Sequence, residues 1–286
     1  MDISFHCDEN KNFHFPEQML RAFSYREYAI RAHDHDFYEL NIVLGGSGVH
    51  QIENASLLVR RGDVFMIPPH TVHAYTDTTH LEVYHVLFRR EFIDQNRPEA
   101  EGVRGFIELT EIEPLLRRHT ATALLRLTPR ELSGVYAELS LLDEETGENE
   151  VGDEPLRRHA AWKLLYTLSR LLHERIKGGF SVQSVQDRHA NAITALLTYI
   201  HAHLSEDLSL GHLCRLSYLS RSTLLRAFSA ICGATPSEYV TECRLRQAEY
   251  LLRDGKHSKT EIAHLVGFYD LSHMERARGK QNRKKT

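Results

Sequence analysis

Two histidines and a glutamate stand at the spacing H-x-H-x3-E in the segment HDHDFYELNIVLGG, residues 33–46, which ends on Gly46. In a strand, side chains two residues apart share a face, so one face is expected to gather polar groups. Another histidine follows in GDVFMIPPHTVH, residues 62–73. Three imidazoles and a carboxylate suit a catalytic metal site or the wall of a sensor, or they only satisfy one another. The set is His33, His35, Glu39, Asn41 and His73.

The length and composition of the chain limit the class of protein to which it can belong. With 286 residues and 42% hydrophobic content, the chain is long enough for two domains with their own cores. No apolar run approaches the ~18 residues that span a bilayer, and the first residues, MDIS, do not resemble a signal peptide. We therefore expect a cytoplasmic protein with no membrane partner. The four cysteines form no C-x-x-C pair, which predicts reduced thiols rather than disulfides or a thiolate zinc site.

The net charge of -4 hides an asymmetry between the two parts of the chain. Residues 1–189 carry 21 Lys/Arg against 30 Asp/Glu, a net charge of -9. Residues 190–286 carry 14 against 9, a net charge of +5. A basic C-terminal third on an acidic body is typical of a nucleic-acid-binding module attached to another domain.

Residues 25–90 have the pattern of short strands separated by turn signals. The turn signals are GGSG at 45–48, ENA at 53–55, RGD at 61–63 and PP at 68–69. This spacing predicts a small all-β barrel or sandwich, which we assign to residues 1–110. The predicted strands are Tyr38–Leu44, Val49–Ile52, Leu57–Val59, Val64–Ile67 and Leu81–Phe88.

A helical period replaces the strand pattern over residues 111–177, which we interpret as a relay or dimerisation segment. A capping box, TPRE at 128–131, predicts a helix that runs toward Asp143. A second helix is predicted over about Glu154–Lys177, and its apolar stripe is expected either to pack on the barrel or to form a dimer seam. The polar residues 178–189 have the pattern of an interdomain linker. The stripe consists of Ala161, Leu164, Leu165, Leu168, Leu171 and Leu172.

Residues 190–286 contain an internal repeat of a short helix, a tight turn and a second helix. One copy begins at Leu213 and the other at Ile262. Ser209 and Ser220 can cap the two helices of the first copy, and Cys214 is the small residue that a helix crossing needs. Two copies joined by one long helix, Pro236–Arg253, predict tandem major-groove readers about one DNA turn apart. In the first copy the candidate DNA contacts are Ser220, Arg221, Ser222, Thr223 and Arg226.

This third of the chain resembles the DNA-binding half of the AraC/XylS family of transcription regulators. The resemblance rests on SRSTLLRAF (220–228), TPSEY (235–239), RLRQAEYLLRDG (244–255) and TEIAHLVGFYDLSHM (260–274). It implies an all-α domain of tandem helix-turn-helix units, with Ile262, Ala263, Gly267 and Phe268 as framework. It also implies that the second recognition helix carries Asp270, Leu271, Ser272, His273 and Arg276.

The second copy departs from the family pattern after about residue 277. Arg278 stands where a core aromatic equivalent to Phe228 is expected, and the chain then reads GKQNRKKT. Since no apolar residue follows Ala277, the helix is expected to lose the anchor of its C-terminal half. We interpret this as a truncated second helix-turn-helix with weakened DNA binding; the alternative is a basic tail that binds phosphates.

The H-x-H-x3-E and GDVFMIPPHTVH segments resemble the two cupin motifs, with His70 in place of a glycine and Asp77 in place of an asparagine. In metal-binding cupins the matching residues, here His33, His35, Glu39 and His73, are ligands. AraC-type sensor barrels resemble cupins and often use such residues to hydrogen-bond a sugar-like effector. The form of these segments resembles the sensors of sugar-operon regulators, such as those for rhamnose and chitobiose.

Two function classes follow from these patterns. The first is an effector-responsive, sequence-specific regulator that binds promoter DNA and a sugar or sugar phosphate. We expect it to be a homodimer, with RNA polymerase as a partner if it activates. It requires no cofactor and has no catalytic residue, although a divalent transition metal could occupy the barrel. The second is a metal-dependent cupin isomerase or dioxygenase. The tandem repeat favours the regulator, since an enzyme has no need of two DNA readers.

Overall fold

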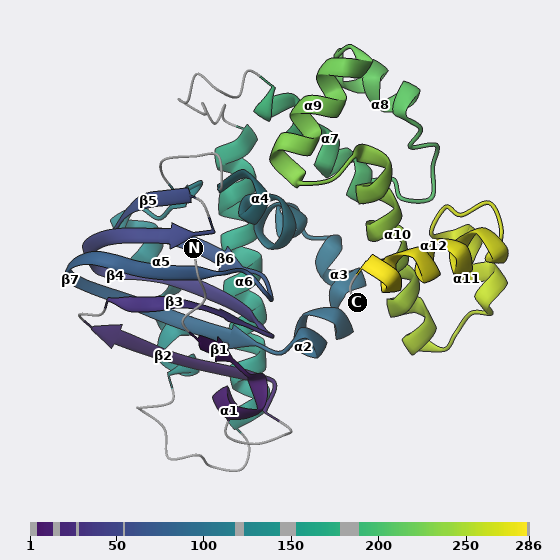
Figure 1. Ribbon diagram of the computed structural model, residues 1–286. Helices are drawn as coiled ribbons and strands as arrows, with labels where there is room; N and C mark the ends of the chain where they lie inside the picture. Colours follow the sequence, from purple (N-terminus) through teal and green to yellow (C-terminus); the bar gives the residue numbers. More distant parts are fainter. Residues whose placement is uncertain are drawn as a thin grey trace. The chain divides into compact units, whose positions relative to one another are not determined.

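The computed structural model describes residues 5–13, 18–26, 29–53, 55–117, 123–143, 153–177 and 189–284. The chain divides into two compact units, residues 1–185 and 186–286. The first is rich in strands and the second is helical, which confirms the predicted fold class (Figure 1). The predicted linker lies outside the described residues except for His189. Within the described part of the chain, no helix is long and apolar enough to cross a membrane.

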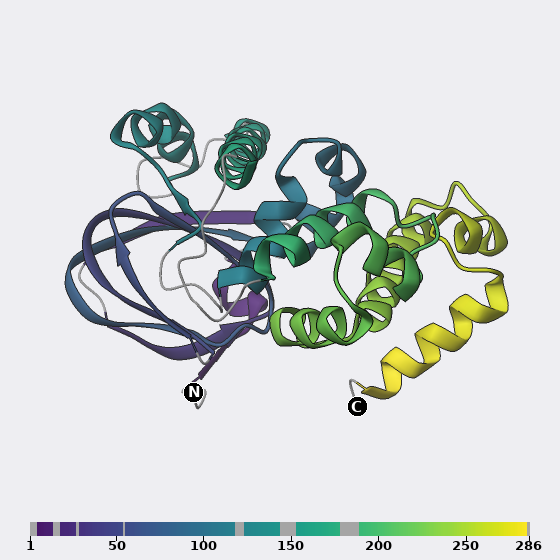
Figure 2. The same cartoon turned by 90° about the horizontal axis from the view of Figure 1, so that it is seen from above.

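The first unit is built on one eight-stranded sheet that curls around a buried interior (Figure 2). Its central strands, β4 and β7, pair with each other along most of their length in antiparallel register. Strand β7 also pairs with β2 at one end and with β3 at the other, while β1 joins β3 in parallel. The strands are β1 (Phe5–Cys7), β2 (Leu20–Arg26), β3 (Ile30–His35), β4 (Tyr38–Ile52), β5 (Ala55–Arg60), β6 (Asp63–Ile67), β7 (His73–Phe88) and β8 (Leu125–Arg126).

The GGSG segment was predicted as a turn, but it lies inside the single strand β4. The register between β4 and β7 shifts three times between Val43 and Val49, so the glycines mark bulges where the strand bends. Gly46 has φ +68°, and a Cβ there would overlap the backbone carbonyl of His80. The two strands predicted on either side of this segment are therefore one strand, because glycine permits the bend without ending the pairing.

All the short helices of this unit except the first, which lies between β1 and β2, follow the last long strand. Two longer helices lie side by side on one outer face of the sheet (Figure 2). Thr128 and Glu131 form the predicted capping box of α5 (Pro129–Leu142). The apolar stripe of α6 (Asp153–Lys177), apart from half-buried Leu171, is buried within this unit, against α5 and neighbouring elements, so the stripe is not an exposed dimer seam. The short helices are α1 (Glu9–Asn12), α2 (Arg90–Gln95), α3 (Arg97–Glu101), the π-helix η1 (Glu108–Ile112) and α4 (Glu113–Arg117).

The second unit contains two helix-turn-helix pairs joined by the long helix α10 (Pro236–Asp254). Ser209 and Ser220 cap the first pair as predicted, with side-chain oxygens that accept from backbone N–H groups. Tyr218 and Gly267 occupy the equivalent turn position of each pair, and both have positive φ. The remaining helices are α7 (Ala190–Ala202), α8 (Leu210–Ser217), α9 (Arg221–Cys232), α11 (Lys259–Leu265) and α12 (Leu271–Lys284).

Helix α12 continues to Lys284, beyond the position where the sequence pattern breaks. This helix contributes three residues to a hydrophobic cluster shared with α10 and α11, namely Leu271, Met274 and Ala277. The helix thus continues beyond Ala277, which is the last of its residues in that cluster. Reduced DNA binding as a consequence of Arg278 stays a prediction.

Candidate effector cavity and DNA-binding surface

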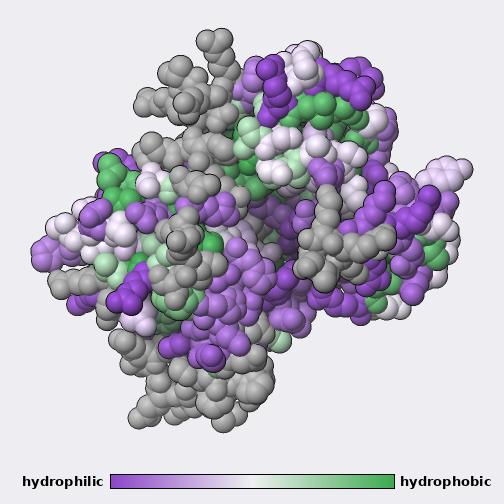
Figure 3. Space-filling model, viewed as in Figure 1, coloured by the Kyte–Doolittle hydropathy of each residue, from purple (hydrophilic) through white to green (hydrophobic). Residues whose placement is uncertain are grey.

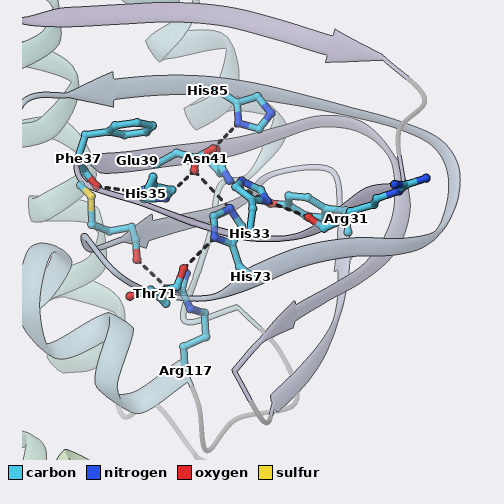
Figure 4. A network of polar contacts seen from close by, with 12 residues as sticks. Arg31, His33, His35, Phe37, Glu39, Asn41, Thr71, His73, His85 and Arg117 are labelled. Carbon is cyan, nitrogen blue, oxygen red and sulfur yellow. Dashed lines mark hydrogen bonds and ion pairs between the residues drawn. The ribbon is translucent and has the colours of Figure 1, made fainter. Parts of the chain in front are cut away.

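The candidate polar residues come from three strands that the sheet brings together. Strand β3 supplies His33 and His35, β4 supplies Glu39 and Asn41, and β7 supplies His73. The register pairs His33 with His73, which explains how residues forty apart in the sequence meet. Figure 4 shows these side chains pointing toward one another around the Glu39 carboxylate.

Glu39 is the centre of the cluster. Its Oε1 lies 2.6 Å from His85 Nδ1, and its Oε2 lies 3.0 Å from His35 Nε2 and 3.3 Å from His73 Nε2. Only 4% of Glu39 is exposed. Burial by itself raises the pKa of this carboxyl, but the hydrogen bonds from the three histidines outweigh burial and hold the pKa well below its usual range. Glu39 is therefore a buried carboxylate that accepts from imidazoles on two neighbouring strands.

Backbone carbonyls orient three of the histidines. His33 Nδ1 lies 2.9 Å from the Arg31 carbonyl, and His35 Nδ1 lies 2.7 Å from the Phe37 carbonyl. His73 Nδ1 lies 3.2 Å from the Thr71 carbonyl. A carbonyl can only accept, so each Nδ1 carries the hydrogen, and His35 and His73 donate to Glu39 through Nε2 only when that nitrogen is protonated as well.

A cavity of about 390 Å³ opens beside this cluster. His33, His35 and Glu39 line it as predicted, whereas Asn41 and His73 are not among its lining residues. Asn41 instead donates to the Tyr75 hydroxyl at 3.2 Å, so its assignment as an effector contact is not supported by its position. The remaining lining residues are Phe5, Cys7, Asn12, Arg21, Phe23, Tyr25, Ala29, Ile30, Phe37, His85 and Leu87.

Sequence reasoning missed two buried histidines of the interior. His85 lies on β7 at the same alternation as His73, so the period of two along that strand could have indicated it. His50 is fully buried and stacks on Tyr75 with ring centroids 4.3 Å apart, and neither ring nitrogen has a described hydrogen-bond partner. Burial first, and the charge of His73 second, hold the pKa of His50 well below its usual value. The β4 bulges shift the alternation, which is why the sequence did not reveal it.

A buried ion pair joins α4 to the interior. Arg117 Nη2 donates to the Met66 carbonyl at 2.7 Å, and its guanidinium lies 5.2 Å from the Phe65 ring centre. Glu113 lies 3.5 Å from Arg117 and accepts from the Met66 N–H. Burial raises the pKa of Glu113 to about 7, against the opposing effects of the Arg117 charge and the Met66 N–H. Figure 4 shows Arg117 reaching toward the polar cluster.

The donor set fits a metal ion in part. One ligand atom each from His33, Glu39 and His73 lie within 4.8 Å of one another. Bond lengths of 2.0–2.2 Å to a transition metal imply ligand–ligand distances of about 3–3.5 Å, which includes the observed 3.3 Å between Glu39 and His73. The predicted fourth ligand, His35, is not in this group although it contacts Glu39.

The N-terminal turn of α9 carries the first set of predicted DNA contacts. Arg221, Ser222 and Arg226 are exposed, and Thr223 is half-buried. Arg226 Nε donates to the Ser222 carbonyl at 3.4 Å, and Arg276 Nε donates to the Ser272 carbonyl of α12 at 3.2 Å. In both recognition helices, therefore, an arginine at the equivalent position donates its Nε hydrogen to the carbonyl four residues earlier. Its terminal amino groups can then contact a base or a phosphate.

Three of the predicted contacts also serve the fold of the second unit. Ser220 and Asp270 are the equivalent caps, since each accepts from the backbone N–H three residues later. Leu271 is half-buried in the hydrophobic cluster and is therefore a packing residue rather than a DNA reader. Ser272 and His273 are exposed beside Arg276. Figure 3 shows hydrophilic side chains over most of the visible face of the α11–α12 pair.

A ligand-sized cavity in one unit and two helix-turn-helix pairs in the other define an effector-responsive DNA-binding transcription regulator. The AraC-like ligand binding domain matches residues 15–175, and a helix-turn-helix domain matches residues 213–281. The chain belongs to the AraC family. It is 26% identical over 242 residues to the HTH-type transcriptional activator RhaS of Escherichia coli O81 (strain ED1a), which covers 85% of this chain and 81% of that protein.

Two solved structures are also similar to the chain. Apo ToxT from Vibrio cholerae strain SCE256 is 15% identical with a TM-score of 0.37, covering 91% of this chain and 93% of that chain. The DNA-binding domain of the global transcriptional factor AdpA, in complex with a target DNA, is 26% identical with a TM-score of 0.31. That match covers 32% of this chain and 81% of that chain.

Proposed function

We propose that the effector of this regulator is a sugar and that its target genes serve carbohydrate utilisation. The observation that carries the proposal is the composition of the cavity wall. Imidazoles grouped around a buried carboxylate can bond sugar hydroxyls, and the rings of Phe5, Phe23 and Tyr25 offer apolar faces to the C–H groups of a sugar ring. The similarity to RhaS supports a regulator of this type.

A neutral sugar suits the cavity better than a sugar phosphate. The ionised Glu39 carboxylate repels an anion near the cavity floor. Among the described lining residues Arg21 is the one lysine or arginine, and its guanidinium already lies 4.8 Å from the Phe23 ring centre and donates to the Asn12 carbonyl. A phosphate would therefore meet no net positive charge from the acidic and basic residues of the described lining, one carboxylate and one guanidinium.

On promoter DNA, we propose that α9 and α12 read adjacent major-groove segments through Arg221, Arg226 and Arg276. A homodimer would place two such modules on repeated half-sites. Since the α6 stripe is buried, the dimer contact would need another surface, and Tyr136 and Leu141 of α5 are half-exposed apolar candidates. Activation would add a contact with RNA polymerase, in the cytoplasm where the promoter DNA is.

Thermal unfolding of the full chain tests the sugar proposal. Neutral sugars and sugar phosphates, with L-rhamnose and chitobiose among them, are added one at a time, because a ligand of the folded state raises the midpoint. We expect one neutral sugar to raise the midpoint and to change promoter binding. A panel of sugars in which none raises the midpoint would contradict the proposal.

A second candidate feature, a divalent transition metal held by His33, Glu39 and His73, is favoured by the orientation of the histidines. Their Nδ1 hydrogens are directed to carbonyls, as is usual for histidine ligands, so Nε2 is the nitrogen of each ring that could coordinate a metal. A metal would supply a Lewis acid for sugar hydroxyls. Elemental analysis of the purified protein tests it: stoichiometric metal that is lost in His73→Ala supports it, and a metal-free protein contradicts it.

The same metal could serve the alternative function, a cupin isomerase or dioxygenase. The two helix-turn-helix pairs favour a sensor, because effector binding in the first unit could then control DNA binding by the second. Turnover of a stabilising sugar by the metal-loaded protein, followed by product analysis, would support the enzyme instead.

A further inference from the structure

His85 differs from the other histidines of the cluster in the partner of its Nδ1. It lies on β7 between Phe23 of β2 and Asn41 of β4. Its Nδ1 lies 2.6 Å from Glu39 Oε1, the shortest of the three contacts of that carboxylate. The imidazole stacks on Phe23 with ring centroids 5.3 Å apart and meets Tyr25 edge-on at 5.7 Å. Two aromatic rings and a carboxylate therefore set the orientation of His85.

The Glu39 contact determines which nitrogen of His85 carries the hydrogen. An ionised carboxylate can only accept, so Nδ1 donates, and in the neutral ring Nε2 presents a lone pair. This Nε2 is buried and has no hydrogen-bond partner among the described residues, while His85 itself lines the cavity. A buried acceptor without a donor costs free energy, which a donor group in the cavity would recover.

Glu39 and His85 are equally buried, each about 4% exposed, but they differ in the partners of their polar atoms. Its Oε1 is bonded to His85, and its Oε2 faces both His35 and His73. A hydroxyl that approached the carboxylate would have to displace one of these imidazoles. Both residues line the cavity, and the polar atom of the pair without a hydrogen-bond partner among the described residues is His85 Nε2 rather than a Glu39 oxygen.

We propose that His85 Nε2 accepts a hydrogen bond from a hydroxyl of the effector, and that Glu39 is a positioning residue that fixes the acceptor tautomer of His85 without touching the effector. This inference rests on the proposed sugar-binding function. It assigns the direction of one hydrogen bond, from the effector to His85, because a hydroxyl can donate to a lone pair whereas a carboxylate or an ionised phosphate cannot. The position beside His85 thus takes a hydroxyl of the effector rather than a carboxylate or a phosphate group.

Two substitutions of His85 separate a contact role from a positioning role. The amide of His85→Asn can stay near the Nδ1 position, beside Glu39, but leaves nothing at the Nε2 position. The amide of His85→Gln reaches the Nε2 position and gives up the Glu39 contact. If His85 touches the sugar, His85→Asn loses more affinity than His85→Gln. If His85 only supports a Glu39–sugar contact, the order reverses.

The experiment titrates the full-length wild type and both variants with L-rhamnose and with chitobiose by calorimetry. We expect the Kd of the bound sugar to rise at least about tenfold in His85→Asn, as loss of a hydrogen bond of about 1.4 kcal/mol implies, and to rise less in His85→Gln. Equal losses, or a larger loss in His85→Gln, overturn the proposal. Failure of both sugars to bind wild type counts against the proposed function with these probes.

Nitrogen NMR of the wild-type chain keeps the proposal falsifiable if a variant does not fold or if no sugar binds. Histidine labelled with ¹⁵N distinguishes a protonated ring nitrogen from one with a lone pair. We expect His85 to have a protonated Nδ1 and a bare Nε2. A hydrogen on Nε2 of His85 overturns the acceptor assignment whatever the sugar result.

Discussion

Replacing Glu113 by glutamine tests how far a buried ion pair stabilises the first unit, residues 1–185, which we call the sensor unit. Glu113 and Arg117 are both fully buried and lie 3.5 Å apart, and both bind the backbone of Met66. The pair looks stabilising, yet burial raises the pKa of Glu113 to about 7. Glutamine has nearly the same volume and keeps an oxygen that can accept from the Met66 N–H, so the change removes the charge with little change in packing.

The magnitude follows from the two pKa values of this group. The folded pKa of about 7 lies above the ordinary value of 4.5, so Glu113 binds its proton more tightly in the folded chain. Its contribution to stability is fully present below pH 4.5 and is lost as pH rises through about 7. At about 1.4 kcal/mol per pH unit, the full loss is about 3 kcal/mol. Glu113→Gln should avoid this loss, so the variant should be more stable than wild type at pH 8 relative to pH 5.

Tryptophan fluorescence provides the assay. Trp162 is the single tryptophan, and it stacks on Phe92 at 5.0 Å within the sensor unit, so its emission reports the unfolding of that unit. Urea unfolding at pH 5, 6, 7 and 8 gives the free energy of unfolding of wild type, Glu113→Gln and the exposed control Glu174→Gln. A difference between wild type and Glu113→Gln that is independent of pH, or that changes in the opposite direction, would refute the reasoning.

Three further predictions concern the effector cavity, the DNA-binding helices and the bulged segment of β4. Glu39→Ala should abolish the response to the stabilising sugar but leave basal promoter binding within about twofold in gel-shift titration. A retained response would contradict the proposal that Glu39 positions His85. Arg226→Ala should weaken promoter binding by about 1–3 kcal/mol with unchanged sugar affinity, whereas the exposed control Arg170→Ala should not. Gly46→Ala should lower the free energy of unfolding, measured by urea unfolding, by at least about 2 kcal/mol, because the residue has a positive φ and its Cβ would overlap the backbone carbonyl of His80. A smaller loss would mean that β4 can relax around the added methyl group.

The sequence alone predicted the features that depend on near neighbours. Period-two runs indicated the strands, the TPRE capping box located the start of α5, and the serines at 209 and 220 marked the first helix-turn-helix. These signals work because a cap or an alternating face involves residues only a few positions apart. The same holds for the repeat, since each helix pair carries its own turn and its own small core.

Only the tertiary structure decided which distant residues meet. Bulges in β4 shift the pairing with β7, so His50 joins the interior although the alternation along β4 does not place it there. The α6 stripe could have faced a second copy, and the folded sensor unit buries it instead. The pattern of a single segment specifies which face is apolar, but the partner of that face depends on long-range pairing and packing, to which every other strand and helix of the unit contributes.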